Sequence, residues 1–216
     1  MIWGAVGPPW WDDRVTVVIG GGPSLSGFDP RAIPDRAHIV GVNQAMLDFP
    51  CEAGISIDFG FVARNQVRLA EFAESRPLYL AVSDRRPERM PAIQSAVYLR
   101  SVSEGLSGPD DYSSAVVDGG TSGFAALQLA VLKRARHIVL LGFDYGLQGD
   151  RDHYHDAYVG HGAGADAATW QRWAENFNVI APQMVARGIE VINASPASQI
   201  SCFPKCSIED ALHAVS

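Results

Sequence analysis

The residues with the most chemical potential gather between positions 150 and 161. These twelve residues include three histidines, two tyrosines and three aspartates. Histidine can act as a general base near neutral pH, and a tyrosine hydroxyl can donate a hydrogen bond to a phosphate oxygen. Acid-base chemistry beside a phosphate is therefore one interpretation, and a solvated polar loop is the other. The eight residues are Asp150, Asp152, His153, Tyr154, His155, Asp156, Tyr158 and His161.

Two versions of such a site are open. Asp150 and Asp152 have the D-x-D spacing with which many glycosyltransferases hold a divalent cation, and His153 and His155 could add nitrogen ligands. A metal-free site would instead stabilise a departing phosphate with tyrosine hydroxyls and helix amides, while a histidine removes the acceptor proton. The residues alone do not choose between the two versions.

A glycine-rich segment follows the first apolar run of the chain. Its glycines would let backbone amides approach a phosphate or sugar closely. The segment has neither the GxGxxG spacing nor the Gly-Lys-Ser/Thr ending of the common nucleotide loops, and a plain tight turn is the alternative. The residues predicted to contact a nucleotide here are Gly20, Gly21, Gly22, Pro23 and Ser24, followed by Leu25.

A second candidate for anion binding precedes an apolar helix pattern. Thr121, Ser122 and Gly123 would offer two hydroxyls and free helix amides, although an ordinary N-cap explains the same residues. After that helix, a buried run at 137–141 leads to Asp144. This aspartate follows the carboxyl end of a strand, where ligands bind in open α/β sheets.

The elements that would position these residues alternate along the chain. β-branched apolar runs predict strands at 15–19, 38–42, 55–58, 78–82, 96–99, 137–141 and 189–192. Apolar residues at three- and four-residue spacing predict helices at 66–75, 122–136 and 166–187, the last capped by Gly188. The segments 103–118 and 144–165 are polar and glycine-rich, which predicts functional loops. The expected fold is a single Rossmann-like α/β domain over 1–216, with a mostly parallel sheet covered by helices on both faces.

Composition restricts the partners. The formal charge of −7 gives no sign of a polybasic surface for nucleic acid, although a modified base as acceptor stays open. The opening residues lack the pattern of a signal peptide, and no apolar run reaches the roughly 20 residues of a membrane span. We therefore expect a cytoplasmic protein. Cys51, Cys202 and Cys206 lack CxxC spacing, which predicts reduced thiols.

The order of the short motifs resembles the bacterial sialyltransferases of glycosyltransferase family 42. That family has a Gly-Pro-Ser-Leu loop after strand one, an Asn-Gln pair after strand two, a Thr/Ser-Ser-Gly helix start, a Gly-Ile/Phe-Asp strand end and a Tyr-x-Gly-His segment. The likeness runs from about residue 15 to residue 200. The corresponding residues here are Gly22-Pro23-Ser24-Leu25, Asn43-Gln44, Thr121-Ser122-Gly123, Gly142-Phe143-Asp144 and Tyr158-Val159-Gly160-His161.

The resemblance implies a GT-A-like variant of the fold and a role for each motif. His161 would be the general base, Tyr158 a neighbouring active-site hydroxyl, and Tyr154 a donor to the leaving phosphate. Asn43 would hold the donor nucleotide. The family is inverting and metal-independent, so the resemblance implies no cofactor besides a nucleotide sugar, which would be CMP-linked. A hydroxyl compound would be the acceptor.

Some positions depart from the family pattern. Gly21 replaces the asparagine of the glycine loop, and Gly119 or Gly120 stands where a basic acceptor-binding residue is expected. The glycine loop and the Gly-Phe-Asp strand end also resemble archaeal-type pterin diphosphokinases, which need ATP and Mg²⁺. Alternative functions are therefore such a kinase and a non-catalytic nucleotide-sugar-binding protein. Short proteins with closing segments like 193–198 and 203–205 are of a kind associated with phage and prophage genomes. The sequence leaves the oligomeric state, including a homo-oligomer, open.

Overall fold

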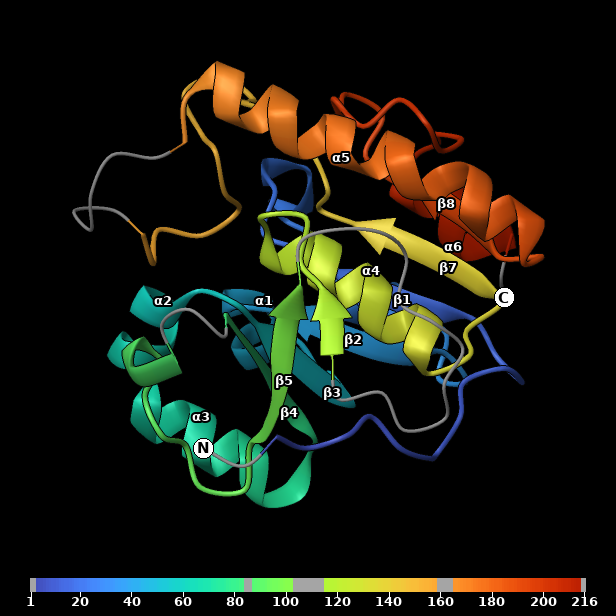
Figure 1. Ribbon diagram of the computed structural model, residues 1–216. Coiled ribbons are helices and arrows are strands. Elements are labelled where there is room, and N and C mark those ends of the chain that lie inside the picture. The colour runs from blue at the N-terminus through green and yellow to red at the C-terminus, as the bar shows by residue number, and fades with distance from the viewer. Residues whose placement is uncertain (1–2, 84–86, 103–114, 159–164, 215–216) are drawn as a thin grey trace.

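The fold is built on one eight-stranded sheet (Figure 1). The structure is a computed structural model and describes residues 3–83, 87–102, 115–158 and 165–214. The strand order is β6-β5-β4-β3-β2-β1-β7-β8, and each of the seven neighbouring pairs is parallel. The predicted α/β class with a parallel sheet is therefore confirmed.

The strands follow the predicted apolar runs closely. The runs at 38–42 and 137–141 match β2 and β7 at both ends, and the other predicted strands differ by one to three residues at their ends. β6 was missed because it has only three residues and lies within the segment expected to be a loop. The strands are β1 (Thr16–Ile19), β2 (His38–Val42), β3 (Ala53–Ser56), β4 (Leu78–Ser83), β5 (Val97–Val102), β6 (Ala115–Val117), β7 (His137–Leu141) and β8 (Glu190–Asn193).

The long helices also agree with their periodicity. α3 has the predicted bounds, and Gly188 lies just after the last helical turn of α5 with a φ of 67°, as the C-cap prediction requires. α4 ends at Leu132 rather than at the predicted Arg136, because Arg134 adopts a φ of 67°. The helices are α1 (Gln44–Asp48), α2 (Phe59–Arg64), α3 (Gln66–Ser75), α4 (Ser122–Leu132), α5 (Ala167–Ala186) and α6 (Ile208–Ala214).

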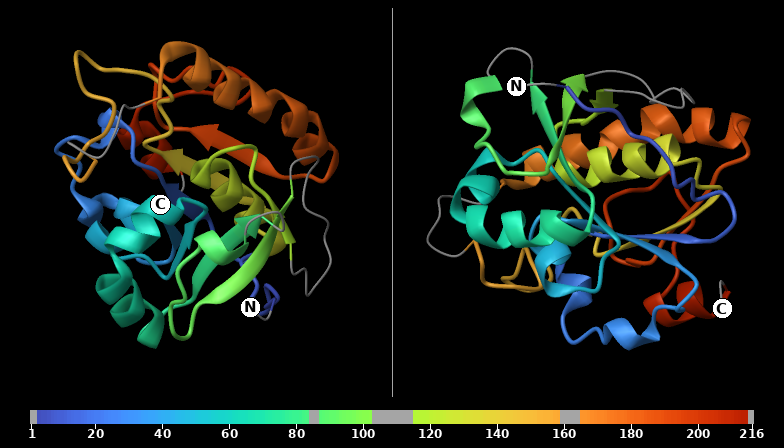
Figure 2. Two further views of the ribbon diagram at one scale, coloured as in Figure 1. Left: turned by 60° about the vertical axis from the view of Figure 1, so that its left-hand side comes forward. Right: turned by 90° about the horizontal axis from the view of Figure 1, so that it is seen from below.

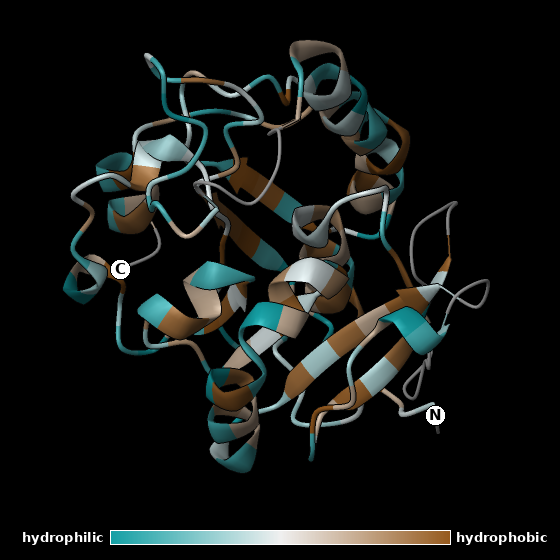
Figure 3. Ribbon diagram, turned by 90° about the vertical axis from the view of Figure 1, so that its left-hand side faces the viewer, coloured by the Kyte–Doolittle hydropathy of each residue, from teal (hydrophilic) through white to brown (hydrophobic). Residues whose placement is uncertain are grey.

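Helices cover both faces of the sheet (Figure 2). α4 and α5 pack on one face, where they meet side chains such as Val18, Val40 and Leu140. α1, α2, α3 and α6 supply the cluster on the other face, which contains Val17 and Val139. Figure 3 shows the resulting pattern, in which the strands are largely hydrophobic and hydrophilic residues recur along the helices. No helix in the described ranges is both long enough and apolar enough to cross a bilayer.

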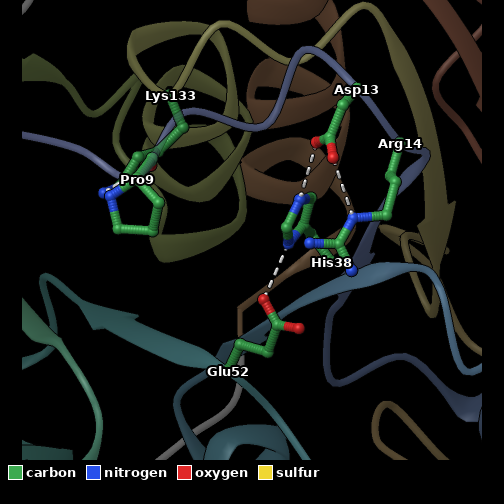
Figure 4. A network of polar contacts seen from close by, with 6 residues as sticks. All are labelled: Pro9, Asp13, Arg14, His38, Glu52 and Lys133. Atoms are coloured by element: carbon green, nitrogen blue, oxygen red, sulfur yellow. Dashed lines mark hydrogen bonds and ion pairs between the residues drawn. The ribbon is translucent and has the colours of Figure 1, made fainter.

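The N-terminal segment crosses the amino-terminal edge of the sheet. His38, at the start of β2, is 3% exposed, and its ring stacks on Trp11 at 5.4 Å. Its Nδ1 lies 2.8 Å from Glu52, and its Nε2 lies 3.4 Å from Asp13 (Figure 4). The hydrogen bond with His38 is the main reason that the pKa of Asp13 is lowered. These contacts attach the segment before β1 to the starts of β2 and β3.

A buried lysine joins the same segment to α4. Lys133 is 2% exposed, and its Nζ donates to the carbonyl oxygens of Gly7 at 2.5 Å and Pro9 at 3.3 Å. Its ammonium also lies 5.3 Å from the centre of the Trp11 ring. Burial lowers the pKa of Lys133 to about 8, because the charged form loses its hydration.

Lys133 should make the free energy of unfolding depend on pH. Its pKa is about 8 in the folded chain and 10.5 as an ordinary value, so between these values the unfolded chain binds more protons. The unfolding free energy should therefore rise as the pH increases across this interval. Urea titrations of the wild type and Lys133→Met should give a difference in unfolding free energy that grows with pH.

The comparison uses a difference because other buried groups titrate in the same interval. Burial raises the pKa of Cys51 and Tyr79 to about 12, which lowers stability at high pH in both proteins alike. A difference that stayed constant from pH 8 to 10.5 would contradict the desolvation of the Lys133 ammonium.

Candidate functional site

The candidate site lies where the strand order reverses. β1 has β2 on one side and β7 on the other, and the chain proceeds from these neighbours toward opposite ends of the sheet. Connections from β1 and β7 therefore leave on opposite sides, which opens a crevice outside their carboxyl ends. The glycine loop follows β1 at this point, and the Gly142–Phe143–Asp144 turn follows β7.

These two turns are bonded directly to each other. The amide of Gly20 donates to the Leu141 carbonyl at 2.8 Å, and the amide of Gly22 donates to the Gly142 carbonyl at 2.9 Å. A side chain on Gly22 would overlap the carboxylate of Asp144. Position 22 must therefore be a glycine because of the contact with β7, whether or not a ligand also approaches the loop.

Asp144 organises this contact from a buried position. It is 3% exposed, and its Oδ2 accepts the Ser24 hydroxyl at 2.7 Å, while Gln148 donates to its Oδ1 at 3.2 Å. Burial raises its pKa, although the hydrogen bonds from Ser24 oppose the shift. Ser24 also lies 3.1 Å from the hydroxyl of Ser195. Asp144, Ser24 and Pro23, which we expected at the nucleotide, do not line the crevice, because these bonds hold them behind its glycine wall.

The crevice is a cleft of about 670 Å³. Its walls come from the carboxyl ends of β1, β2, β3 and β7, the first turn of α4, the segment 152–158 and the start of α5. A cleft of this size fits a nucleotide or a small ligand. The lining residues are Gly20, Gly21, Gly22, Val42, Asn43, Gln44, Ile57, Asp58, Phe59, Gly120, Thr121, Ser122, Gly123, Gly142, Phe143, Tyr145, Gly146, Asp152, His153, His155, Tyr158, Ala165, Trp170 and Trp173.

Two buried polar atoms at this cleft, Asn43 Oδ1 and the Tyr158 hydroxyl, make no well-aligned hydrogen bond within the described ranges. The Asn43 side chain still lies close enough to Tyr158 to oppose the rise in the pKa of Tyr158 that burial causes. A third atom, His153 Nδ1, faces the Asp152 carboxylate at 2.9 Å without the alignment of a hydrogen bond. Asn43 also adopts a φ of 51°, an uncommon backbone conformation that costs free energy. Buried polar groups are nearly always well paired in folded proteins, so the poor pairing of Asn43 and Tyr158 in one cleft indicates a place for a polar ligand.

The first turn of α4 forms another wall. Thr121 is its N-cap, and its Oγ1 accepts the Phe124 amide at 3.1 Å and lies 2.9 Å from the Tyr145 hydroxyl. The Ser122 hydroxyl accepts the amide of Ile57 at 3.1 Å. Both hydroxyls therefore bond within the protein, whereas the amides of Ser122 and Gly123 lack intrahelical acceptors and lie at the positive end of the helix dipole.

A cluster of aromatic and imidazole rings covers the glycine loop. The rings of His153, His155 and Tyr158 lie 4.9–5.3 Å from one another. The amide of Tyr154 donates to the Gly21 carbonyl at 3.1 Å, which ties this segment to the loop. Burial lowers the pKa of His155 to about 4, with a further contribution from His153, so the ring is neutral near pH 7.

Tyr154 does not face the cleft. Its ring packs on Phe49 at 5.4 Å, and its hydroxyl donates to Asp48 Oδ2 at 3.0 Å. This hydroxyl, which we expected to reach the leaving phosphate, is therefore bonded to α1. Tyr158 does line the cleft, with the guanidinium of Arg64 5.6 Å from its ring centre.

The structure brings most of the predicted residues together and adds others. Gly20 to Gly22, Asn43, Thr121 to Gly123 and Tyr158 share the cleft, whereas His161 lies outside the described residues. Sequence reasoning missed Asp58, Phe59 and the two tryptophans of α5. The W-x-x-W spacing of Trp170 and Trp173, one helical turn apart, was the available signal for the latter pair.

The D-x-D residues do not come together with the histidines as a metal site. In the described part of the chain, no three His, Cys, Asp or Glu side chains are grouped so that they could hold a metal ion. Asp150 is exposed, and Asp152 Oδ1 lies 2.9 Å from His153 Nδ1.

A smaller cavity of about 400 Å³ adjoins the cleft and shares Ile57 and Phe59 with it. Its wall includes Met90 and Arg89, whose guanidinium lies 3.9 Å from the centre of the Phe59 ring. The two cavities together leave room for two ligands side by side.

Comparisons with known proteins place the fold. No protein-family model matches the chain, and no curated protein sequence matches it either. The sialyltransferase CstII from Campylobacter jejuni, solved with cytidine-5'-monophosphate, superposes with a TM-score of 0.54 at 12% identity, covering 92% of this chain and 86% of that chain. The same enzyme with CMP-3FNeuAc gives a TM-score of 0.52 at 13% identity, over 91% and 87% of the chains.

A third structure, CST-II with a trisaccharide acceptor and CMP, gives a TM-score of 0.53 at 12% identity and covers 91% of this chain and 87% of that chain. At such low identity the likeness establishes the fold, which is sialyltransferase-like, as the resemblance implied. The phage and pterin-kinase parts of the resemblance stay predictions.

Substitutions at two positions of the glycine loop should differ in their effect on the unfolding free energy. Gly22→Ala should lower the unfolding free energy by about 1–3 kcal/mol, because its Cβ would overlap the buried Asp144 carboxylate. Gly21→Ala is the matched control, since its Cβ would meet only side-chain atoms, the His153 ring at 3.1 Å and His155 Nε2 at 3.8 Å, and a side chain can move. It should change stability by less than about 1 kcal/mol. Equal effects in denaturant titrations would contradict the contact between the glycine loop and β7.

Proposed function

We propose that this chain is a sialyltransferase-like glycosyltransferase. It transfers a sugar from a CMP-sugar, or another nucleotide sugar, to a hydroxyl acceptor. The transfer inverts the anomeric centre and uses no metal ion or other cofactor.

The proposal rests on one observation, the poorly paired Asn43 Oδ1 and Tyr158 hydroxyl in the cleft at the strand reversal. Asn43 Oδ1 accepts hydrogen bonds, and the Tyr158 hydroxyl can donate one, so together they suit a polar base, ribose or phosphate. The solved proteins that share this fold hold cytidine monophosphate. A cytidine nucleotide is therefore the first ligand to consider here.

A departing phosphate in this cleft would be held by hydrogen-bond donors rather than by charge. The described lining residues include the acidic Asp58 and Asp152 and no lysine or arginine. The Gly21 amide, the first turn of α4, the neutral His155 ring and the Tyr158 hydroxyl would supply the hydrogen-bond donors instead. Such preorganised donors stabilise the charge that develops on the leaving oxygens more strongly than they stabilise the bound substrate.

The reaction needs one bond broken and one formed. The bond between the anomeric carbon and the phosphate oxygen breaks, and CMP leaves with the electron pair. The acceptor oxygen attacks the opposite face of that carbon, and its proton passes to a general base. We assign this role to His161, on the Tyr-x-Gly-His resemblance. The acceptor would occupy the smaller cavity beside Phe59, next to the donor.

A thermal-shift screen tests the donor. At a ligand concentration of a hundred times the dissociation constant, binding adds about 2.7 kcal/mol to the stability of the folded chain. For a chain of 216 residues this corresponds to a rise in Tm of roughly 5–10 °C. CMP and CDP should raise the Tm more than AMP or ATP does. A larger rise with ATP and Mg²⁺ would instead support a pterin diphosphokinase-like enzyme.

Tyr158→Phe is the matched variant for this screen. It removes only a buried hydroxyl that lies close to the Asn43 side chain without a well-aligned hydrogen bond, so the Tm of the free protein should change little. The rise in Tm produced by CMP should become smaller, because the ligand loses a hydrogen bond. An unchanged rise would place the nucleotide elsewhere.

His161→Ala tests the mechanism once a donor and an acceptor are identified. Because a base acting on the acceptor works mainly in the transition state, turnover should fall about 10²- to 10⁴-fold with little change in donor affinity. His213→Ala is the control, since this exposed histidine lies in α6. Near wild-type turnover of His161→Ala, with activity lost on chelation and on replacing Asp150 or Asp152, would overturn the metal-free mechanism.

A further inference from the structure

His155 is held in one tautomer by its own loop. The backbone amide of Ala157 donates to Nδ1 at 3.2 Å. A nitrogen that accepts a hydrogen bond carries no proton, so the proton of the neutral ring is on Nε2. A second proton, on Nδ1, would point at the N–H of Ala157, so that two hydrogen-bond donors would face each other. This geometry acts in the same direction as the burial that lowers the pKa of His155 to about 4.

The protonated edge of this ring faces the glycine loop. A Cβ on Gly21 would lie 3.8 Å from His155 Nε2, and both residues line the cleft. Within the described ranges, Nε2 has no hydrogen-bond partner. The loop therefore presents a neutral N–H donor beside the backbone that follows β1.

The groups around His155 explain why the donor should be neutral. Its own segment contributes Asp152, His153 and Asp156, with the hydroxyls of Tyr154 and Tyr158, and α1 contributes Asp48. The three carboxylates favour protonation, but burial and His153 outweigh them. A neutral donor can stabilise a phosphate oxygen without the cost of desolvating a cation.

His153 is arranged in the opposite sense. Its Nδ1 faces the Asp152 carboxylate at 2.9 Å, which favours a proton on Nδ1 and leaves Nε2 as an acceptor. His153 Nε2 is also 3.8 Å from the position of a Cβ on Gly21. Of these two rings, His155 is therefore the one whose edge toward Gly21 is arranged as a donor.

We infer that His155 is a further catalytic residue, which donates its Nε2–H to a phosphate oxygen of the donor nucleotide as the sugar is transferred. It takes the place that sequence reasoning gave to Tyr154, whose hydroxyl is bonded to Asp48. The inference rests on the proposed function, because it requires a nucleotide donor in the cleft.

Two substitutions separate the donor from the loop contact. The side-chain amide of His155→Gln can place an N–H near the position of Nε2 but loses the bond from Ala157. The shorter amide of His155→Asn can keep an acceptor for Ala157 near the position of Nδ1 but has no donor near Nε2. A purely structural histidine would be replaced better by Asn, and a phosphate donor would be replaced better by Gln.

The measurement is the ratio of the affinities of CMP and cytidine, which differ only in the phosphate, by isothermal titration calorimetry. His155→Asn should lower the CMP affinity about 10- to 100-fold, as for a lost hydrogen bond to a charged group, and leave cytidine binding unchanged. His155→Gln should stay within about threefold of the wild type. Equal CMP affinities in all three proteins, or a loss confined to His155→Gln, would overturn the inference while leaving the proposed function intact.

A second readout does not depend on the nucleotide. Two-bond ¹H–¹⁵N spectra of the imidazoles should show His155 as the neutral Nε2–H tautomer at pH 6, and inorganic phosphate should shift its Nε2 signal in the wild type. A protonated ring at pH 6, an Nδ1–H tautomer, or no response to phosphate would each contradict the assignment. If CMP and cytidine both failed to bind while phosphate still shifted His155, the nucleotide of the proposed function would be wrong and the phosphate contact would stand.

Discussion

The architecture of the site depends on the close contact between the glycine loop and the end of β7. Backbone hydrogen bonds from Gly20 and Gly22 to the end of β7 bring the two segments so close that no side chain fits at Gly22. Asp144 then fills the space behind the loop and holds Ser24. Because β1 and β7 are neighbours at the strand reversal, this contact positions the glycine-loop backbone that lines the cleft. The asparagine, histidines and tyrosine around it are arranged relative to that wall.

The cleft is polar without being cationic. Asn43 and Tyr158 keep buried atoms poorly paired there, and Asn43 does so from a strained backbone conformation. An unpaired buried polar atom costs free energy in the ligand-free chain, and a ligand that pairs with it recovers that cost. The cost is therefore consistent with binding at this place. The neutral His155 ring, the helix amides and the Tyr158 hydroxyl suit a monoanionic or dianionic phosphate that must be released after transfer, since a buried cation would hold the product more tightly.

The buried polar groups at the two edges of the sheet differ in how fully they are hydrogen-bonded. At the amino-terminal edge, His38 and Lys133 are almost fully buried and their polar atoms are bonded to Glu52, Asp13 and the carbonyls of Gly7 and Pro9. At the carboxyl-terminal edge, polar atoms are left open. Buried groups that are satisfied stabilise one conformation, whereas unsatisfied ones in a cleft are typical of binding sites. The positions of the charged and polar groups thus separate stability from function in this fold.

The sequence alone determined the class of fold and most of the site. β-branched runs specify buried parallel strands through local periodicity, and glycines or caps at the ends of those runs mark where ligands approach. That reasoning found Asn43, the glycine loop, the start of α4 and Tyr158. Only the tertiary structure decided which groups face the cleft. Ser24 and Asp144 turn toward each other, Tyr154 bonds to Asp48 in α1, and Trp170 and Trp173 arrive from α5. These outcomes depend on contacts between residues that are distant in sequence, which periodicity and spacing do not encode.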